Sequence, residues 1–222
     1  MTNAEKIEKL EAEIAALKSE GYLTPQEAAI EVTVCLMCCN SRFTIFPVIE
    51  SFGSQGMRVD LLTAMDESST DPTRVILEDL PRWTNNSSAI ASCRFLGTIP
   101  HKGLEQTLAH SKAKFAHEAQ TEYVWFNDDD VVLPPGAINS ALSILRGASD
   151  IGAVCVPYSL KNDHLEHGAM LMRTSVARDV GFDGRGRCGC VNLAKDLNES
   201  GLKMVAADCR AYHMKYKTLL VG

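Results

Sequence analysis

Three consecutive carboxylates, Asp128–Asp130, interrupt an otherwise apolar stretch that runs from Tyr123 to Pro135. A buried strand does not normally carry three adjacent charges, because removing even one from water costs several kcal/mol unless it is paired or binds a metal. We therefore expect the triplet where a strand leaves the core at the edge of a cleft. Mg²⁺ is usually held by one or two carboxylates together with substrate phosphates, so the pattern favours a divalent cation as ligand. The alternative is a solvated loop that caps the helix after Pro134-Pro135-Gly136.

Strands and helices alternate around the triplet. Continuous apolar runs predict strands, and periodic apolar residues predict helices. We expect strands at 32–37, 58–65, 123–126 and 151–157, and helices at 44–52, 104–119 and 135–146. The middle of the chain, between the second strand and the helix at 104–119, has the composition of a poorly ordered stretch. This alternation is typical of a doubly wound α/β sheet.

Polar residues follow the predicted strands where they end. Asn40 comes after the first strand, Asp66–Asp71 after the second and Asp128–Asp130 after the third. In such sheets, ligands bind at the carboxyl ends of the strands. The three groups are therefore predicted to converge on one cleft.

The overall composition is that of an ordinary soluble globular protein. Of the 222 residues, 45% are hydrophobic and 23% are charged, which is enough for one α/β domain with a sizeable core. The net charge of -6 argues against a broad non-specific nucleic-acid surface. No apolar run approaches the ~18 residues of a membrane span. The N-terminus does not resemble a signal peptide, so we expect an intracellular, cytoplasmic protein whose cysteines are mostly free thiols.

The first 22 residues are predicted to form a separate element ahead of the main domain at 23–222. Apolar residues recur at heptad a/d spacing, at Ile7, Leu10, Ile14 and Leu17. Two interpretations are open: an amphipathic helix docked on the domain, and a helix for dimerisation or partner binding.

Three segments together resemble a known family. Val32–Arg42 contains the first strand and an Asn-Arg ending, and Leu61–Thr73 contains the second strand and an acidic Ser-Thr-Asp loop. Trp125–Pro135 contains the third strand, which ends in an Asp-x-Asp motif. In this order they resemble family-2-like glycosyltransferases of the GT-A fold, with Ser68 where the family has glycine. A weaker similarity links Gly168–Arg173 and Val180–Asp183 to the family's acceptor-side strand and Gly-Phe-Asp turn.

The resemblance implies a GT-A-like (Rossmann-like) mixed, mainly parallel sheet flanked by helices. It implies a glycosyltransferase whose donor is a nucleotide sugar, a UDP-sugar by preference, used with Mn²⁺ or Mg²⁺. Asp128 and Asp130 would bind the metal, and Asp130 would thereby take part in catalysis. A divalent cation would neutralise the leaving diphosphate as a Lewis acid.

Further positions carry expected roles in donor binding. Asn40, Arg42, Asp66, Glu67 and Asp129 are predicted on the nucleotide side, with Asp66 or Glu67 accepting hydrogen bonds from nucleobase or ribose. If the Asp-x-Asp motif begins one residue earlier, Asn127 and Asp129 are the homologous pair, but Asn127 would contribute no charge.

A late histidine, His213, resembles one that the family places near the metal. As a third ligand it would favour Mn²⁺ over Mg²⁺. The alternative for a lone histidine is a structural or exposed side chain.

The chain departs from the family at the expected general base. Inverting members carry an acidic pair just before a late helix, and one carboxylate there takes the proton of the acceptor hydroxyl. Here Cys190 and Asn192 occupy those positions, and Asp183 is our candidate substitute, with Asp196 as a second. Inverting and retaining chemistry both stay open.

Other functions also stay open. A catalytically impaired binding or scaffold protein is the main alternative. A sugar nucleotidyltransferase is disfavoured, because no glycine-rich loop follows the first strand. The acceptor is a saccharide, a protein, a lipid or a modified nucleobase.

Overall fold

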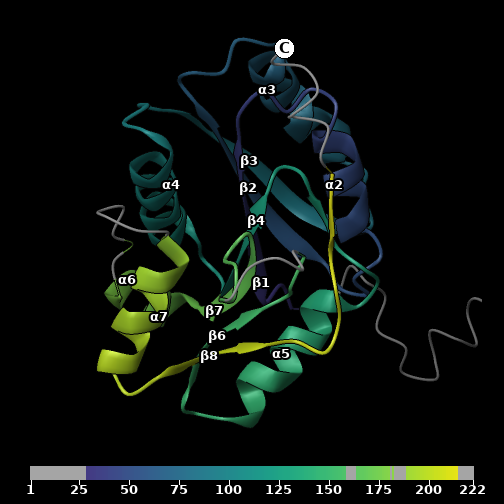
Figure 1. Cartoon of the computed structure of the whole chain (residues 1–222). Coiled ribbons are helices and arrows are strands. Elements are labelled where there is room, and N and C mark those ends of the chain that lie inside the picture. The colour runs from purple at the N-terminus through teal and green to yellow at the C-terminus, as the bar shows by residue number, and fades with distance from the viewer. Residues whose placement is uncertain (1–28, 159–163, 181, 183–188, 215–222) are drawn as a thin grey trace, which may run out of the picture.

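The computed structural model describes residues 29–158, 164–180, 182 and 189–214. Seven strands form its main sheet: β1 (Val32–Cys38), β2 (Val59–Asp66), β3 (Ile90–Ile99), β4 (Tyr123–Asp128), β6 (Ile151–Cys155), β7 (Ala169–Arg173) and β8 (Lys203–Ala206). Their order across the sheet is β3-β2-β1-β4-β7-β6-β8. Only β7 is antiparallel to its neighbours β4 and β6, and the other pairs are parallel. The predicted mixed, mainly parallel α/β sheet is confirmed (Figure 1).

Helices cover both faces of this sheet. The described helices are α2 (Ile45–Phe52), α3 (Thr73–Thr84), α4 (Leu104–Glu118), α5 (Ala137–Gly147), α6 (Thr174–Asp179) and α7 (Gly189–Glu199). Helices α2, α3 and α5 pack in one apolar cluster on one face, and α4, α6 and α7 pack in a second cluster on the other. Figure 1 shows the two helical layers on either side of the strands. The result is a three-layer α/β/α arrangement.

The sequence of β1 explains why both layers are needed. Val32, Val34 and Leu36 belong to one apolar cluster, whereas Cys35 belongs to the other. Successive side chains of a strand point to opposite faces, so a continuous apolar run requires cover on both sides. Helix α2 supplies part of that cover, because its buried residues recur with helical spacing.

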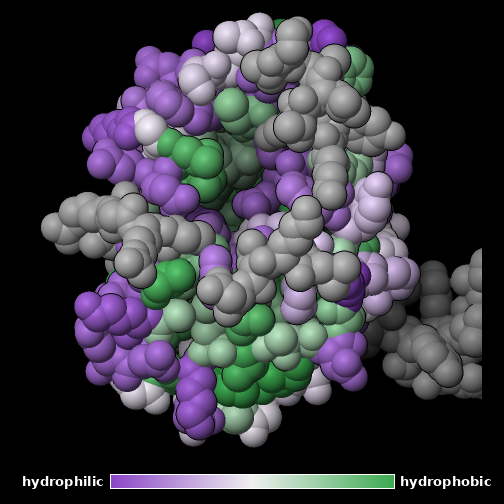
Figure 2. Space-filling view, viewed as in Figure 1, coloured by the Kyte–Doolittle hydropathy of each residue, from purple (hydrophilic) through white to green (hydrophobic). Residues whose placement is uncertain are grey.

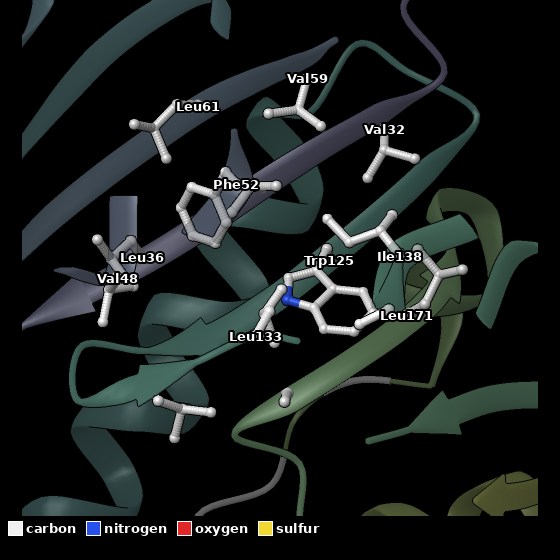
Figure 3. Close-up of a cluster of buried hydrophobic side chains, with 14 of the residues drawn as sticks. Val32, Leu36, Val48, Phe52, Val59, Leu61, Trp125, Leu133, Ile138 and Leu171 are labelled. Carbon is white, nitrogen blue, oxygen red and sulfur yellow. The ribbon is translucent and has the colours of Figure 1, made fainter. Parts of the chain in front are cut away.

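A large aromatic residue packs in the first apolar cluster, beside the turn that follows β4. Trp125 of β4 is fully buried among aliphatic side chains of β1, β7 and α5 (Figure 3). Its indole Nε1–H donates to Asn127 Oδ1 at 2.9 Å. The Asn127 amide in turn donates to the carbonyl oxygens of Asp128 and Val131, each at 2.8 Å. Because buried polar groups are costly unless they are bonded, this network fixes the turn that follows β4.

Two sequence expectations are corrected by the fold. The middle of the chain, expected to be poorly ordered, holds helix α3 and the ten-residue edge strand β3. Strand β3 alternates exposed and covered residues, as an edge strand does, so it lacks the continuous apolar run that identified the other strands. Helix α5 starts at Ala137 and not at Pro135, because Gly136 has a left-handed φ of 72° that a helix cannot contain.

A second, two-stranded sheet is essential to the site. Strands β5 (Val131–Val132) and β9 (Tyr212–His213) pair antiparallel, with Val131 opposite His213. The Met214 N–H donates to the Asp130 carbonyl at 2.7 Å, which extends the pairing by one residue. This sheet brings the last described part of the chain against the turn that follows β4.

The separate element predicted for residues 1–22 lies outside the described residues, as does its boundary with the main domain. Both stay predictions.

Candidate functional site

The three carboxylates of the triplet take different directions at the end of β4. Asp128 is the last residue of the strand, and Asp129 and Asp130 form the turn that follows. The two turn residues differ in burial, because Asp129 is buried and Asp130 is partly exposed. Each carboxylate therefore has to be considered separately.

Asp129 faces the loop after β1. Its Oδ2 accepts the Cys39 N–H at 2.7 Å and the hydroxyl of Ser41. Hydrogen bonds to a charged acceptor contribute about 1.5–3 kcal/mol each when they are buried. These contacts describe a carboxylate that joins the ends of β1 and β4. The donor-binding role expected for Asp129 stays untested, and Asn127, its partner in the alternative register, is bonded within the core.

Asp128 lies on the other side, against β7 and Tyr158. The Tyr158 hydroxyl donates to Asp128 Oδ2 at 3.2 Å, and burial together with that carboxylate raises the pKa of Tyr158 well above its usual range. The hydroxyl therefore keeps its proton and acts as a donor. Gly168 packs directly against the carboxylate, since a Cβ added there would lie 2.5 Å from Asp128 Cγ.

Asp130 meets His213 through the β5–β9 pairing. Asp130 Oδ2 lies 3.1 Å from His213 Nε2. The His213 ring also contacts the Tyr158 ring edge-on, with 5.4 Å between the centroids. Asp128, Tyr158, His213 and Asp130 are thus linked in one continuous chain of contacts. Two of the three predicted metal ligands are in direct contact, and the third is joined to them through Tyr158.

The oxygen and nitrogen ligands of Asp130 and His213 suit a divalent cation whose coordination sphere is completed by a substrate. Two ligand atoms about 2.1 Å from an octahedral ion, at right angles, lie about 3.0 Å apart, which is close to the Asp130–His213 separation. Among the described residues, no three His, Cys, Asp or Glu side chains are placed to hold a metal by themselves. Hydrated Mg²⁺ and similar ions need only one or two protein carboxylates when substrate phosphates supply the rest.

Asn40 holds the neighbouring loop at residues 68–71. Its backbone has a left-handed φ of 52°, which Asn tolerates better than most residues. Its Oδ1 accepts the N–H groups of Thr70 at 2.8 Å and Asp71 at 3.2 Å. Asp71 in turn accepts the Arg42 N–H at 3.1 Å. The predicted convergence of the loops after β1 and β2 is therefore seen in the structure, with Asn40 acting through the loop that it holds.

Asp66, at the end of β2, pairs with a residue that sequence reasoning missed. Asp66 accepts the Ser68 N–H at 2.8 Å, and both its oxygens lie 3.0 Å from His101 Nδ1. Burial by itself would raise the pKa of Asp66, but the Ser68 amide and His101 outweigh it and hold the pKa below its usual range. Asp66 is therefore ionised at neutral pH. His101 follows β3, whose existence the sequence did not reveal.

The other two predicted nucleotide-side residues are more exposed. Glu67 accepts the His101 N–H at 3.3 Å, beside Asp66. The Arg42 guanidinium lies 4.2 Å from the centre of the Phe43 ring. Figure 2 shows that this face of the molecule is hollowed between the positions of α4 and α2 in Figure 1.

A buried lysine and a half-buried histidine lie on the opposite side of Asp128. Lys112 of α4 is 6% exposed, and its Nζ contacts His167 Nδ1 and lies 3.5 Å from the His167 carbonyl. Burial lowers the pKa of Lys112, and the nearby Asp128 carboxylate opposes that shift. Burial and the Lys112 charge lower the pKa of His167 to about 2, so its ring is neutral. Because an ammonium can only donate, His167 Nδ1 is the acceptor and its ring proton lies on Nε2.

The first turn of α7 is where the expected base positions fall. Cys190 is buried there, and Asn192 follows on the same turn. Asp183 lies outside the described residues, so its proposed role stays a prediction. Glu105, at the start of α4, accepts the Gly189 N–H at 3.0 Å. Sequence reasoning did not identify Glu105.

Solved structures with the same fold are known glycosyltransferases. A mannosyltransferase from Pyrobaculum calidifontis, PcManGT, in complex with GDP-Man and Mn²⁺, matches with a TM-score of 0.68 and 15% identity over 87% of this chain and 59% of its own. S. aureus TarS (residues 1–349) in complex with UDP-GlcNAc matches with a TM-score of 0.60 and 15% identity, over 84% of this chain and 59% of its own.

These matches show that the chain has the GT-A-like fold of glycosyltransferases. The chain spans about three fifths of the length of these proteins, 59% in both cases. No family model matches the sequence, and no curated protein matches it. In the part of the chain that the structure describes, no helix is long and apolar enough to cross a membrane.

Proposed function

We propose that the chain is a glycosyltransferase that takes a sugar from a nucleoside diphosphate sugar with the help of a divalent cation. The observation that carries the proposal is the contact chain from Asp128 through Tyr158 and His213 to Asp130, at the carboxyl end of the sheet. The fold supports it, because ligands of such sheets bind at that end.

Asp130 and His213 would hold the cation, with Asp128 beside them. When bound, the cation would neutralise the charge that develops on the leaving diphosphate. The Tyr158 hydroxyl, protonated and bonded to Asp128, fixes the orientation of that carboxylate. Asp129 keeps the turn in place through Cys39 and Ser41.

The nucleoside would lie on the β1–β2 side of the site. There Asp66 and Glu67, joined by His101, would offer oxygen acceptors to a nucleobase or ribose. Asn40 and Arg42 would act from the adjoining loop. A uridine donor is our first choice, and the structures of PcManGT with GDP-Man and of TarS with UDP-GlcNAc define the range of donors to test.

Thermal shifts with UDP, GDP, UDP-glucose, UDP-GlcNAc and GDP-mannose, each with Mn²⁺ or with EDTA, test the proposal. A ligand that binds only the folded state raises the unfolding midpoint according to RT ln(1 + [L]/Kd). We expect a shift with Mn²⁺ that EDTA abolishes and that Asp130→Ala and His213→Ala remove. Asp79→Ala, an exposed aspartate of α3, is the matched control. Absence of any Mn²⁺-dependent shift in the wild-type protein would refute the proposal.

A donor-binding protein without transfer activity is the second candidate. Cys190 and Asn192, which stand where a general base is expected, favour it. It predicts the same Mn²⁺-dependent shifts without release of nucleoside diphosphate from any donor.

A further inference from the structure

A glutamate from another helix lies next to the expected positions of the missing acidic pair. Glu105 belongs to the first turn of α4, yet its Oε2 lies 3.0 Å from the Gly189 nitrogen at the start of α7. The family's acidic pair is expected at the start of this helix, where this chain has Cys190 and Asn192. A carboxylate is therefore present beside those positions, although it comes from a different part of the sequence.

Glycine at 189 leaves the space that Glu105 uses. A Cβ added at Gly189 would lie 3.2 Å from Glu105 Oε2 and 3.0 Å from His167 Nε2. Contacts of 3.0–3.4 Å are tighter than nine in ten real Cβ contacts, so a side chain at 189 would require Glu105 or His167 to move by a few tenths of an ångström. No left-handed φ requires glycine at this position. The small residue is thus explained by the two side chains that converge on it.

The surroundings form a small pocket in which one wall is polar. Glu105, Lys112, His167 and Gly189 line it together with the apolar Phe182 and Leu193. The Lys112 contact fixes His167 as a neutral ring with its proton on Nε2. His167 therefore offers a donor to the pocket, and Glu105 offers the basic oxygen.

The pocket adjoins the carboxylates of the proposed donor site. His167 is followed by Gly168, whose carbonyl accepts the Asp128 N–H at 2.7 Å and whose Cα packs on the Asp128 carboxylate. A hydroxyl group bound between Glu105 and Asp128 would therefore lie on the α7 side of a sugar whose diphosphate is held on the Asp130 side.

We propose that Glu105 is the general base that activates the acceptor hydroxyl in the reaction proposed above. The acceptor O–H proton passes to the Glu105 carboxylate while the acceptor oxygen forms a bond to the anomeric carbon. The bond between that carbon and the diphosphate oxygen breaks, and its electron pair leaves with the nucleoside diphosphate. Attack from the side opposite the leaving group inverts the configuration. Glu105 then releases the proton to solvent.

Water can serve as the acceptor in the test, since the natural acceptor is unidentified. The experiment measures Mn²⁺-dependent hydrolysis of UDP-glucose, UDP-GlcNAc and GDP-mannose by the full chain and by Glu105→Gln. Glutamine keeps an oxygen for the Gly189 N–H but lacks the basicity of a carboxylate. General-base catalysis contributes about 10²–10⁴-fold, so we expect a loss of at least ~10²-fold in kcat with an unchanged donor-induced thermal shift. Glu118→Gln, on the exposed side of the same helix, is the matched control and should keep full activity.

Two further measurements distinguish a general-base role of Glu105 from a purely structural role as a cap of helix α7. Sodium formate should restore part of the activity of Glu105→Ala, which a purely structural role would not allow. The first sugar released from an α-linked donor should be the β anomer by NMR. Wild-type kcat in Glu105→Gln, absence of formate rescue, or an α product would each overturn the assignment and leave donor binding intact. Donor binding by the wild type without turnover would overturn it too, and absence of donor binding would overturn the proposed function with it.

Discussion

Gly168→Ala should disable the donor site by moving one carboxylate. The added Cβ would lie 2.5 Å from Asp128 Cγ and would also collide with the Tyr158 hydroxyl. Non-bonded carbons pack at about 3.5–4.0 Å, so the carboxyl group has to move by about 1 Å or more. Gly168 has no left-handed φ, so the perturbation is steric and not conformational.

A displacement of that size has a definite kinetic cost. Misplacing a reacting or binding group by about 1 Å lowers the rate about 10²-fold, which corresponds to ~2.7 kcal/mol of transition-state stabilisation. Overpacking of a tight site also lowers the free energy of unfolding by about 1–3 kcal/mol. We therefore expect kcat/KM for Mn²⁺-dependent donor turnover to fall about 10²-fold, with a protein that still folds.

The assay needs one control for the effect of a glycine-to-alanine change itself and a second control for the role of the Asp128 carboxylate. Gly147→Ala, where a Cβ meets nothing within 4 Å, should keep full turnover and wild-type stability. In an Asp128→Ala background, Gly168→Ala should cost less stability, because the colliding carboxylate is gone. Turnover by Gly168→Ala within twofold of wild type, or an equal stability loss in both backgrounds, would refute this explanation.

Three other predictions concern the scaffold around the site. Asp129→Ala removes two charge-assisted hydrogen bonds, from Cys39 and Ser41, and should lower the free energy of unfolding by about 3 kcal/mol in urea titrations. Asp130→Ala should change that free energy by less than about 1 kcal/mol, and equal losses in the two variants would contradict the division of roles. The folded-state pKa values of Asp66 and Asp71 are lowered, because hydrogen bonds from Ser68 and Thr73 outweigh the effect of burial. The ionised forms of the two residues therefore stabilise the fold above about pH 4. This contribution is lost as the pH falls through the folded-state pKa values. The Asp66→Asn/Asp71→Asn double variant should therefore lose less stability than wild type as the pH falls below about 4, and a parallel loss would contradict the assignment. Asn40→Ala should lower stability by about 1–2 kcal/mol in the same titration, because the left-handed backbone and the bonds to the 68–71 loop both depend on the side chain, and an unchanged midpoint would contradict that role.

Much of the fold could be predicted because it follows backbone periodicity. Strand β1 and helix α2 have apolar patterns that identify an element within a few residues. Strand β3 could not be found in this way, because an edge strand with one exposed face has no continuous apolar run. With β3 unrecognised, His101, which pairs with Asp66 across two strand ends, was also missed.

The residues of the candidate site also fall into those that local sequence predicts and those that it does not. Local sequence located Asp66 and the Asp128–Asp130 triplet at strand ends, since the polar residues directly follow the apolar runs. It could not place Glu105, because nothing near residue 105 indicates a contact with Gly189. That contact depends on how two helices on the same face of the sheet are positioned.

The sequence by itself determined that three carboxylates leave the core together at the carboxyl end of a parallel strand. Only the tertiary structure decided what each one does. Asp129 turns to the β1 loop, Asp128 to Tyr158, and Asp130 to His213 through the β5–β9 pairing. The reason is physical: side-chain direction follows a fixed alternation only inside a strand, and in the turn beyond it the direction is set by which distant groups supply hydrogen-bond partners.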